Sequence, residues 1–433
     1  NRRFAHEFMA ASPEYTGRER AVTYVGILLG YLFDGYDLII ISFILSPLII
    51  YFNTSLGAVS LAIAISLVGA VAGGIFFGWL ADRIGRRNSL LITIALFGVM
   101  TVLTGFINSL TELYALRFLA GLGIGGEWGV GFSLLSESWP AGTRGTAGGA
   151  LQSMFIVGSL AGAVTAGYML SVYGPAVGWR YSFIAAGGLA LALLPLRLLM
   201  PESKAWSDYN RRRKSGNLSR DYDVRSPILQ IFSRGYVSRT ILFTLLAGAF
   251  LFFVYSFISF IPSYFGAYGI PVPTYTTIIV IAELAGIGGL MLDGLLSDLI
   301  GRRRAAIVFA GVSIVSVLFF LYEALVAPRF TGIYSFPLFY AYAAIYFATG
   351  FGGNLGIWIG ENYLTKMRAT ATNFTYMVGR GLGAGLAPIL IPIWASSLGL
   401  GMAMSVGMVI GVAIQFLVVF GIRETKGTRI TAL

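Results

Sequence analysis

Long apolar stretches alternate with short polar segments along the whole 433-residue chain. Each stretch has roughly 20 residues or more, enough for a helix to cross a hydrocarbon core of ~30 Å. Lipid offers backbone N–H and C=O groups no partner, so these stretches are predicted to be helices. The twelve stretches lie at about 21–48, 58–80, 89–107, 112–135, 144–172, 180–200, 239–265, 274–297, 305–326, 336–359, 371–395 and 400–422. The pattern predicts an all-α polytopic membrane protein with twelve transmembrane helices.

One long polar segment, residues 201–237, separates the first six stretches from the last six. We therefore predict an N-terminal six-helix half at 1–200, a cytoplasmic linker at 201–237 and a C-terminal six-helix half at 238–433. The linker contains the run Arg211-Arg212-Arg213-Lys214. Because basic segments of this kind face anionic lipid, we interpret the linker as a solvated tether at the membrane surface.

Two short polar patterns each occur twice, once in either predicted half. G-x-x-x-D-x-x-G-R-R fills residues 78–87 and 294–303, and E-x6-R-x-T-A begins at Glu137 and Glu361. The copies are separated by 216 and 224 residues, which indicates an internal repeat. Repeated halves of this kind place their binding site between them, near the middle of the membrane.

The aspartates of the first pattern lie where a neighbouring helix N-terminus and the loop arginines can hold them. Contacts of this kind form in one conformation and break in another, so we interpret both patterns as a conformational latch. The alternative is that these basic turns only fix the topology. The predicted latch residues are Gly78, Asp82, Arg83, Gly85, Arg86, Glu137, Arg144, Gly294, Asp298, Gly301, Arg302, Glu361 and Arg368.

Composition and charge agree with a membrane protein and exclude several other classes. The chain is 57% hydrophobic and 11% charged, whereas soluble domains are roughly 25% charged. The net charge of +11 reflects the predicted membrane topology, because 26 of the 30 Lys and Arg fall on one side of the predicted spans. By the positive-inside rule, both termini are predicted to be cytoplasmic in the cell membrane, and no nucleic-acid partner is expected.

Several absences narrow the chemistry further. The chain has no cysteine, and its one histidine, His6, lies in a polar segment, so we expect no metal and no cofactor. Residues 1–20 are polar, so we expect no cleavable signal peptide. None of the four lysines follows a glycine, which excludes the phosphate-binding loop of an ATP-driven pump. We expect a monomer that is not an enzyme.

Ionisable residues inside the apolar stretches are the strongest functional signal, since each costs roughly 2.5–3.5 kcal/mol at a helix centre. Asp34 and Asp37 are three residues apart and share a helical face. Two close carboxylates in a low dielectric suit reversible protonation. The alternative is a structural ion pair with Arg117. The ionisable residues in the stretches include Asp34, Asp37, Arg117, Glu127, Glu283 and Arg380, of which Glu283 is left unassigned.

The motifs resemble those of the major facilitator superfamily. Residues 30–38, 117–128, 137–140 and 374–380 are similar to segments of its carboxylate (sialate- and lactate-type) and aromatic-acid proton symporters. The resemblance implies a twelve-helix transporter in which Asp34, Asp37, Arg117 and Glu127 serve proton coupling. Arg380 would bind a substrate carboxylate through its planar fork, helped by Gln152, Asn354 and Tyr376. Its alternative is a structural pair with Glu283 or Glu361.

Other segments resemble different branches of the same superfamily. Pro201-Glu-Ser and Glu424-Thr-Lys-Gly are similar to sugar-porter loops, and the span 1 and span 4 motifs also resemble phosphate symporters. We predict a proton-coupled symporter of a small organic anion, namely a monocarboxylate, a sugar acid or an aromatic acid. A sugar or phosphate symporter is the alternative, and a channel or a non-transporting receptor would be a different class.

Overall fold

The computed structural model describes residues 15–215, 226–326 and 337–427, and within these ranges it is built from helices. His6 lies outside the described residues. The helices are α2 (Gly17–Phe43), α3 (Leu45–Phe52), α4 (Leu56–Ile84), α5 (Arg86–Thr104), α6 (Leu110–Ser138), α7 (Arg144–Tyr173), α8 (Pro175–Leu191), α9 (Leu194–Leu199), α10 (Lys204–Lys214), α11 (Pro227–Gln230), α12 (Val237–Ile258), α13 (Ile261–Ala267), α14 (Val272–Ile300), α15 (Arg302–Val326), α16 (Pro337–Ala348), α17 (Leu355–Glu361), α18 (Arg368–Leu398) and α19 (Leu400–Gly421), with short 3-10 helices η1 (Thr349–Gly352) and η2 (Thr365–Met367).

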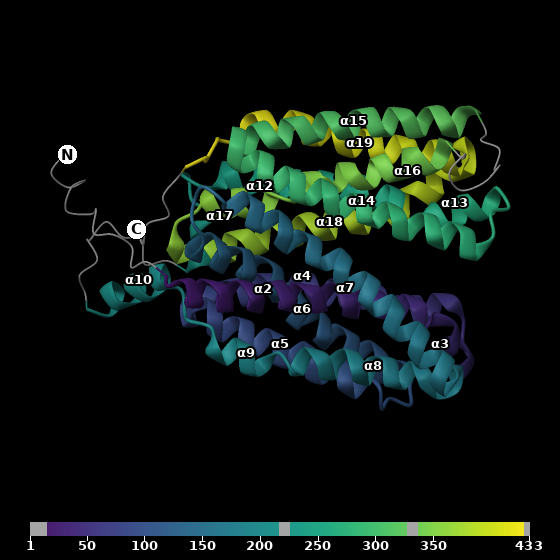
Figure 1. Cartoon of the computed structure of the whole chain (residues 1–433), viewed down its shortest axis with the longest axis horizontal. Helices are drawn as coiled ribbons and strands as arrows, with labels where there is room; N and C mark the ends of the chain where they lie inside the picture. Colours follow the sequence, from purple (N-terminus) through teal and green to yellow (C-terminus); the bar gives the residue numbers. More distant parts are fainter. Residues whose placement is uncertain (1–14, 216–225, 327–336, 428–433) are drawn as a thin grey trace.

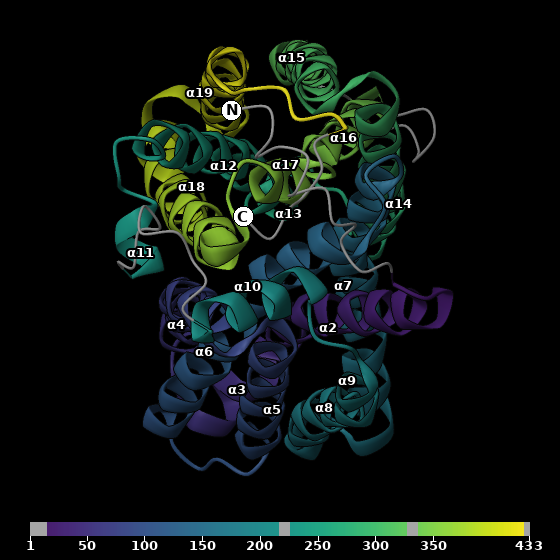
Figure 2. The same cartoon turned by 90° about the vertical axis from the view of Figure 1, so that its left-hand side faces the viewer.

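Long helices run side by side along the longest axis of the molecule (Figure 1). Viewed from one end, α4, α5, α6 and α8 gather on one side and α12, α15, α18 and α19 on the other, with α2 and α7 between them (Figure 2). α10 lies at one end of the bundle, called the motif face below, and α3 and α13 lie at the opposite face (Figure 1). The domain boundaries at residues 200 and 238 stay a prediction.

Eleven helical segments in the described part of the chain are long and apolar enough to cross a membrane. The stretch at 336–359, predicted as the tenth of twelve unbroken helices, is instead divided into α16, η1 and α17. Its break contains Thr-Gly-Phe-Gly-Gly-Asn at 349–354, and glycine has a low helix propensity. The prediction of an all-α multi-span fold is confirmed, and the prediction of a continuous helix at 336–359 is wrong.

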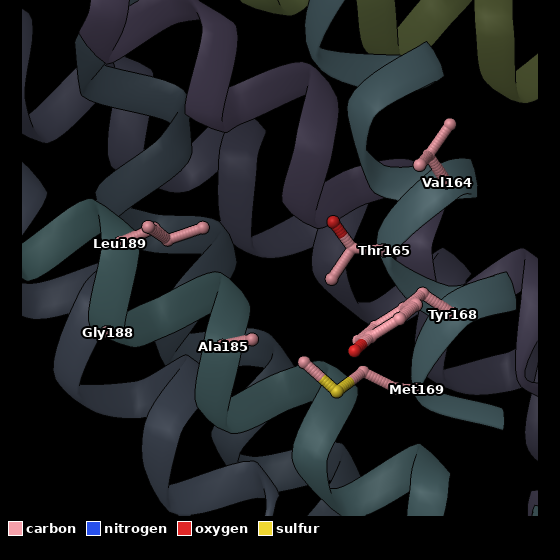
Figure 3. A pocket seen from close by; sticks show the side chains of 7 residues that line it. All are labelled: Val164, Thr165, Tyr168, Met169, Ala185, Gly188 and Leu189. Carbon is pink, nitrogen blue, oxygen red and sulfur yellow. The ribbon is translucent and has the colours of Figure 1, made fainter. Parts of the chain in front are cut away.

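The outer surface of the bundle is apolar, as a lipid-facing surface must be. Large aliphatic side chains project from several helices, including Ile50 (75% exposed), Leu417 (71%) and Val315 (68%). A depression between α7 and α8 belongs to this surface, because Val164 and Tyr168 on its wall are both more than half exposed (Figure 3). The depression therefore faces outward and is separate from the bundle centre.

Local sequence sets the helix boundaries on both faces. α2 begins with a capping box in which Thr16 and Glu19 bind each other's backbone N–H groups. Between α4 and α5, and again between α14 and α15, a single glycine turns the chain. Gly85 has φ +104° and Gly301 has φ +109°, a backbone region that other residues rarely adopt. The two motif loops are therefore tight turns.

The first part of the predicted linker differs from a solvated tether. α10 buries Trp206 and Tyr209, and the Trp206 indole N–H donates a hydrogen bond to the Asp82 carbonyl at 3.0 Å. Apolar residues at the start of this otherwise basic helix explain the difference, because they are buried against the motif face. The basic run that ends α10 lies beyond these buried residues.

Candidate functional site

A cavity of about 310 Å³ lies between the two groups of helices, near the middle of the bundle. Its lining is largely apolar and aromatic. Ser42 and Ile258, at the ends of α2 and α12 next to the opposite face, also line it. The lining residues are Tyr31, Ser42, Ile63, Leu67, Gln152, Phe155, Ile156, Ser159, Phe250, Leu251, Val254, Tyr255, Ile258, Glu283, Leu290, Tyr346, Thr349, Tyr376 and Arg380. The cavity therefore extends toward the face opposite the motif loops.

Arg380 reaches this cavity from α18 and is 9% exposed. Its guanidinium lies near the hydroxyls of Tyr255, Tyr376 and Tyr31, and it forms no ion pair within the described residues. The alternative pairing is wrong, because Glu361 binds other arginines and Glu283 lines the cavity without reaching Arg380. A buried arginine surrounded by tyrosines is therefore left facing the cavity with its charge available to an anion.

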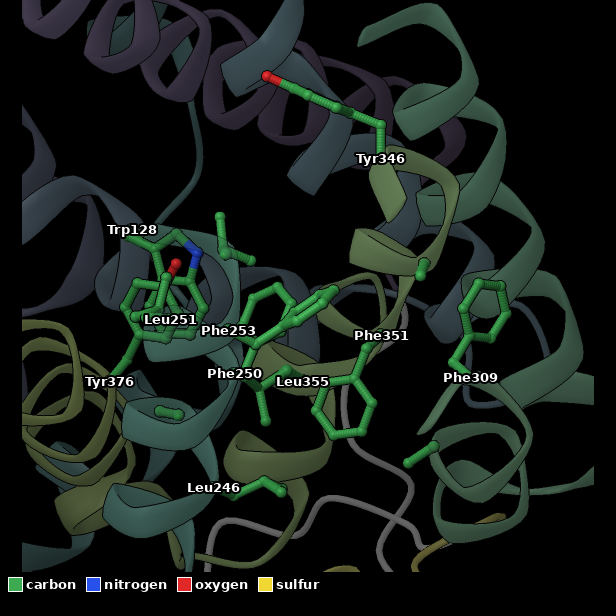
Figure 4. Close-up of a cluster of buried hydrophobic side chains, with 14 of the residues drawn as sticks. Trp128, Leu246, Phe250, Leu251, Phe253, Phe309, Tyr346, Phe351, Leu355 and Tyr376 are labelled. Carbon is green, nitrogen blue, oxygen red and sulfur yellow. The ribbon is translucent and has the colours of Figure 1, made fainter. Parts of the chain in front are cut away.

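Gln152 and Tyr376, two predicted substrate residues, form the cavity wall nearest the motif face. The Gln152 amide accepts a hydrogen bond from the Trp128 indole at 2.9 Å and donates one to Tyr31 at 3.2 Å. Tyr376 stacks on Trp128 with ring centroids 3.5 Å apart (Figure 4). Since Trp128 belongs to α6 and Tyr376 to α18, this stack joins the two groups of helices directly beneath the cavity.

Asn354, also predicted to bind substrate, lies elsewhere. Its backbone N–H and its side-chain amide both donate to Asp293, at 2.8 Å and at 2.8 to 3.0 Å. Asn354 is absent from the cavity wall, and the break between η1 and α17 explains why. The unravelled turn leaves a backbone N–H that Asp293 satisfies. Sequence reasoning overlooked Asp293, although an aspartate inside span 8 was a visible signal.

Asp37 and Arg117 form a buried ion pair in the N-terminal group of helices. Their side chains are 3.0 Å apart and 3% and 1% exposed. Thr101 donates to Asp37 at 2.7 Å, and Arg117 donates to the hydroxyls of Thr101 and Thr104. The structural ion pair considered as the alternative is therefore present, and Asp37 has its own basic partner.

Asp34 points into a different environment from Asp37. It is 2% exposed, and its Oδ1 has no hydrogen-bond partner among the described residues. Its strongest electrostatic neighbours are Glu127, Arg197 and Arg380, ahead of Asp37. Glu127 is bound by Arg197 at 2.5 Å and by Thr93. The two carboxylates, expected as close neighbours on one helical face, therefore have different partners: Asp37 pairs with Arg117, whereas Asp34 lies near Glu127, Arg197 and Arg380.

Arg197 was overlooked because it falls at the end of span 6, where a basic residue suggests a loop. In the structure it is fully buried in α9. Gly30 makes room for it, because a Cβ there would lie 2.6 Å from the Glu127 carboxylate and closer still to the Arg197 guanidinium. The glycine one turn before Asp34 is the signal that could have predicted this contact.

The first motif loop forms a buried ion-pair network with the opposite group of helices. Arg86 binds Glu137 through two nitrogens at 3.0 Å and lies 3.0 Å from Asp82. Glu137 is also bound by Arg368 at 2.6 Å. The Asp82 carboxylate accepts hydrogen bonds from the Thr370 backbone N–H and hydroxyl at 2.8 and 2.7 Å, at the N-terminus of α18. The α4–α5 turn is therefore fastened to α18.

The second motif loop forms the equivalent network, with the roles of the two halves of the chain exchanged. Arg302 binds Glu361 through two nitrogens at 3.2 and 3.1 Å and lies 2.7 Å from Asp298. Glu361 is also bound by Arg144 at 2.9 Å. The Asp298 carboxylate accepts hydrogen bonds from the backbone N–H groups of Gly145 and Thr146, at the N-terminus of α7. The α14–α15 turn is thus fastened to α7.

The glycines of the motifs allow these close approaches. A Cβ at Gly78 would lie 2.8 Å from the Ala369 carbonyl, and one at Gly294 would lie 2.5 Å from the Gly145 carbonyl. Arg83 is the exception among the predicted latch residues. It is exposed and its guanidinium lies 4.4 Å from the Trp79 ring, because it points away from the network on the helix surface. The second motif has Leu299 at this place.

Glu202 and Glu424 complete the two networks and were missing from the predicted set. Glu202 accepts the backbone N–H of Arg86 at 2.8 Å, and Glu424 accepts that of Arg302 at 2.9 Å. Each glutamate thereby caps the helix that follows its motif turn. The Pro201-Glu-Ser and Glu424-Thr-Lys-Gly segments were interpreted only as family resemblances, and their equivalent places in the two halves were the stronger signal.

The chain thus forms a multi-span helical bundle with a central cavity between its two sides and paired ionic networks at one face, an arrangement typical of membrane transporters. The chain belongs to the Major Facilitator Superfamily, whose profile matches residues 27–388. It is a secondary transporter and not an enzyme. It spans the membrane several times.

Individual relatives extend over nearly the full chain. The sialic acid transporter NanX of Escherichia coli is 28% identical over 397 residues, 90% of this chain and 91% of the relative. The cis,cis-muconate transport protein of Acinetobacter baylyi is 29% identical over 388 residues, 88% and 89% of the two chains. The proton:xylose symporter XylE has the same fold, with a TM-score of 0.79 at 19% identity over 95% of this chain and 98% of that one.

Proposed function

We propose that this transporter carries a small organic anion together with protons by alternating access. Arg380 carries the proposal, because it faces the cavity with tyrosine neighbours and no described carboxylate partner. A planar guanidinium binds a carboxylate through two hydrogen bonds. Gln152, Tyr31 and Tyr255 supply further polar groups around it. The two relatives are named for organic acids, which supports the same substrate class.

Proton coupling rests on Asp34 in this proposal. Asp34 is buried, carries an unpartnered oxygen and lies within electrostatic range of Arg380. An anion bound to Arg380 neutralises part of the field that stabilises a negative Asp34. Anion binding and proton binding therefore favour one another, as symport requires. Asp37, Arg117 and Glu127 would hold Asp34 in place through their own ion pairs.

The networks at the motif face provide the closed side of the cycle. They bridge the two groups of helices while the cavity extends toward the other face, so in this proposal the substrate enters the cavity from that other face. Breaking them would open the cavity toward the motif face. We infer that this face, both termini and α10 lie in the cytoplasm, since the basic residues gather there. In this proposal the protein is a monomer in the cell membrane.

Uptake into proteoliposomes tests the proposal. The panel holds monocarboxylates, sugar acids, aromatic acids, phosphate and sugars, each with and without an inward-directed proton gradient. We expect a carboxylate to accumulate only with the gradient. Arg380→Lys keeps the charge and loses the fork, so it should weaken carboxylate binding by about tenfold or more.

Two outcomes would contradict the proposal. Accumulation of a sugar or of phosphate instead of a carboxylate would favour the sugar-porter or phosphate-symporter alternative. Unchanged carboxylate affinity in Arg380→Lys, with transport intact, would remove Arg380 from the site. Thermal stability of the detergent-solubilised variant, matched to the unsubstituted protein, is the control for correct folding.

A further inference from the structure

Trp128 lies directly behind the cavity wall, and its ring is fixed in place. It is 2% exposed and does not itself line the cavity. The ring lies nearly parallel to that of Tyr376, with an interplanar angle of 12° (Figure 4), and 4.8 Å from that of Phe132. The next residue, Gly129, donates its backbone N–H to the Asn373 side chain at 3.1 Å. These contacts hold the indole N–H in one direction, toward Gln152.

The Trp128 indole determines which way the Gln152 side-chain amide points. An indole N–H donates a hydrogen bond and accepts none, so the amide oxygen has to face it, at 2.9 Å. The amide nitrogen is then turned away from Trp128 and donates to the Tyr31 hydroxyl at 3.2 Å. An amide NH2 group carries two hydrogens, and Tyr31 takes one. Because Gln152 lines the cavity, the other is available to a hydrogen-bond acceptor there.

Gln152 and Arg380 share their neighbours. Tyr31 accepts the hydrogen bond from Gln152 and lies within electrostatic range of Arg380. Tyr376 lies near both of these side chains as well. All four residues line the same cavity of about 310 Å³. The amide NH2 group and the guanidinium therefore meet one part of the cavity, where both can donate hydrogen bonds to one anion.

We propose that Trp128 is a positioning residue that holds Gln152 as a hydrogen-bond donor to the anion bound by Arg380. This rests on the proposed function, in which Arg380 binds a carboxylate. An amide without a fixed partner could turn its oxygen toward the cavity, where it would repel a carboxylate, since both groups accept hydrogen bonds. A site that excludes this orientation gains specificity for anions. Trp128 thereby favours a carboxylate over the neutral primary amide of the same shape.

Trp128→Phe tests the inference, because it keeps a ring against Tyr376 and removes the indole N–H. Lactate, gluconate and benzoate represent the three acid classes of the uptake panel, and each has a primary amide of the same shape. Any other acid that accumulates in the panel is added with its own amide. Binding to the purified full-length protein is measured by calorimetry or competition. In Trp128→Phe, affinity for the carboxylate should fall by about tenfold, and its preference over the amide should shrink by a similar factor.

Two further variants separate positioning from packing. Trp358→Phe makes the same change at a buried tryptophan outside the cavity wall, whose indole N–H also donates at 2.9 Å, to the Arg423 carbonyl. It should leave carboxylate affinity within about twofold. Gln152→Ala should lower carboxylate affinity by itself. Adding Trp128→Phe to it should cause no further loss, because the indole acts only through the amide.

Several results would overturn the role of Trp128. They are an unchanged carboxylate affinity in Trp128→Phe, an equal loss in Trp358→Phe, and losses from Trp128→Phe and Gln152→Ala that add in the double variant. Unchanged affinity in Gln152→Ala overturns it too, and that test needs no change at Trp128. Any of these results, with Arg380→Lys still weakening carboxylate binding, leaves the proposed function standing. If no organic acid of the panel binds, both fail.

Discussion

The motif face and the centre of the bundle differ in what the two halves of the chain contribute to each. At the motif face the two halves of the chain are nearly interchangeable: each supplies an aspartate, an arginine, a glutamate and a second arginine, at closely similar distances. At the centre, the charged residues of one half have no charged equivalents at the corresponding places in the other half. The N-terminal helices hold Asp37 and Glu127, each paired with an arginine, beside the unpaired Asp34. The C-terminal helices hold Arg380, Glu283 and Asp293 without ion pairs among the described residues.

Reciprocal contacts explain the symmetry of the motif face. Asp82 binds the N-terminus of α18, and Asp298 binds the N-terminus of α7, so each loop fastens the other group of helices. A face closed by such exchange requires the same chemistry in both copies. The residues at the centre make no such exchange between the halves, and they differ from one half to the other. The two repeated motifs therefore indicate which residues join the two groups of helices at the motif face, and they give no information about the substrate.

The largest effect is expected at the bundle centre for Asp34, the acidic residue that differs most from the paired acids of the motif face. Asp34→Asn should abolish accumulation driven by a pH gradient while exchange of substrate across the membrane continues, because only the proton-binding group is lost. Asp37→Asn should instead reduce folded protein, since breaking a buried ion pair leaves Arg117 uncompensated at a cost of about 3–5 kcal/mol. Uptake assays and thermal unfolding distinguish the two. Normal gradient-driven accumulation by Asp34→Asn would exclude it as the proton carrier.

The next effect tests the symmetry of the motif face. Asp82→Asn and Asp298→Asn each weaken charge-assisted hydrogen bonds worth about 1.5–3 kcal/mol, so both should shift the population toward the motif-face-open state by a similar factor. The chain has no cysteine, so a single cysteine at Ser136, which lies on α6 and is buried against Gly360 of α17, reports opening through its labelling rate. Arg83→Ala is the control and should change nothing. Opposite shifts in the two aspartate variants would contradict the reciprocal arrangement.

Much of the fold was accessible from the sequence, because a hydrophobic stretch of spanning length has one structural solution in lipid. The motif turns were equally readable, since Gly85 and Gly301 need a backbone conformation that favours glycine. The exception was the break at 349–354. Its glycines disfavour a helix, but they lie inside an apolar stretch of spanning length, and the geometry of the break depends on Asp293, a residue 61 positions away.

The candidate site was only partly predictable for the same reason. Arg380, Gln152 and Tyr376 were predicted as substrate residues, and the structure brings all three to one cavity. Which acid pairs with which arginine was not readable, because helix spacing gives neighbours on one helix and not partners on another. Asp34 and Asp37 share a helix, yet Arg117 reaches only Asp37 and Arg197 lies near Asp34.

A smaller effect tests the corrected place of Asn354. Asn354→Ala should lower thermal stability, because Asp293 loses side-chain hydrogen bonds and such losses cost about 1–3 kcal/mol. It should leave substrate affinity within about twofold, since removing a group that never meets the ligand changes little of the binding free energy. Asn354→Asp, which places a second carboxylate against Asp293, should destabilise further. Loss of affinity at unchanged stability would return Asn354 to the substrate site.

The smallest effect concerns the two helix-capping glutamates of the motif face. Glu202→Gln and Glu424→Gln keep an acceptor for the backbone N–H groups, so each should cost less than about 1 kcal/mol of unfolding free energy. Burial raises the pKa of Glu202, and hydrogen bonds from the Ser203 and Arg87 backbone together with the Arg86 charge offset only part of it.

A carboxyl group whose pKa is raised on folding stabilises the fold below its ordinary pKa and loses that contribution as the pH rises through the raised value. The unsubstituted protein should therefore lose a little stability between these two pH values, and Glu202→Gln should flatten that decline. Thermal unfolding in detergent across this range measures it. An unchanged pH profile in Glu202→Gln would show that the Glu202 carboxyl does not titrate in this range.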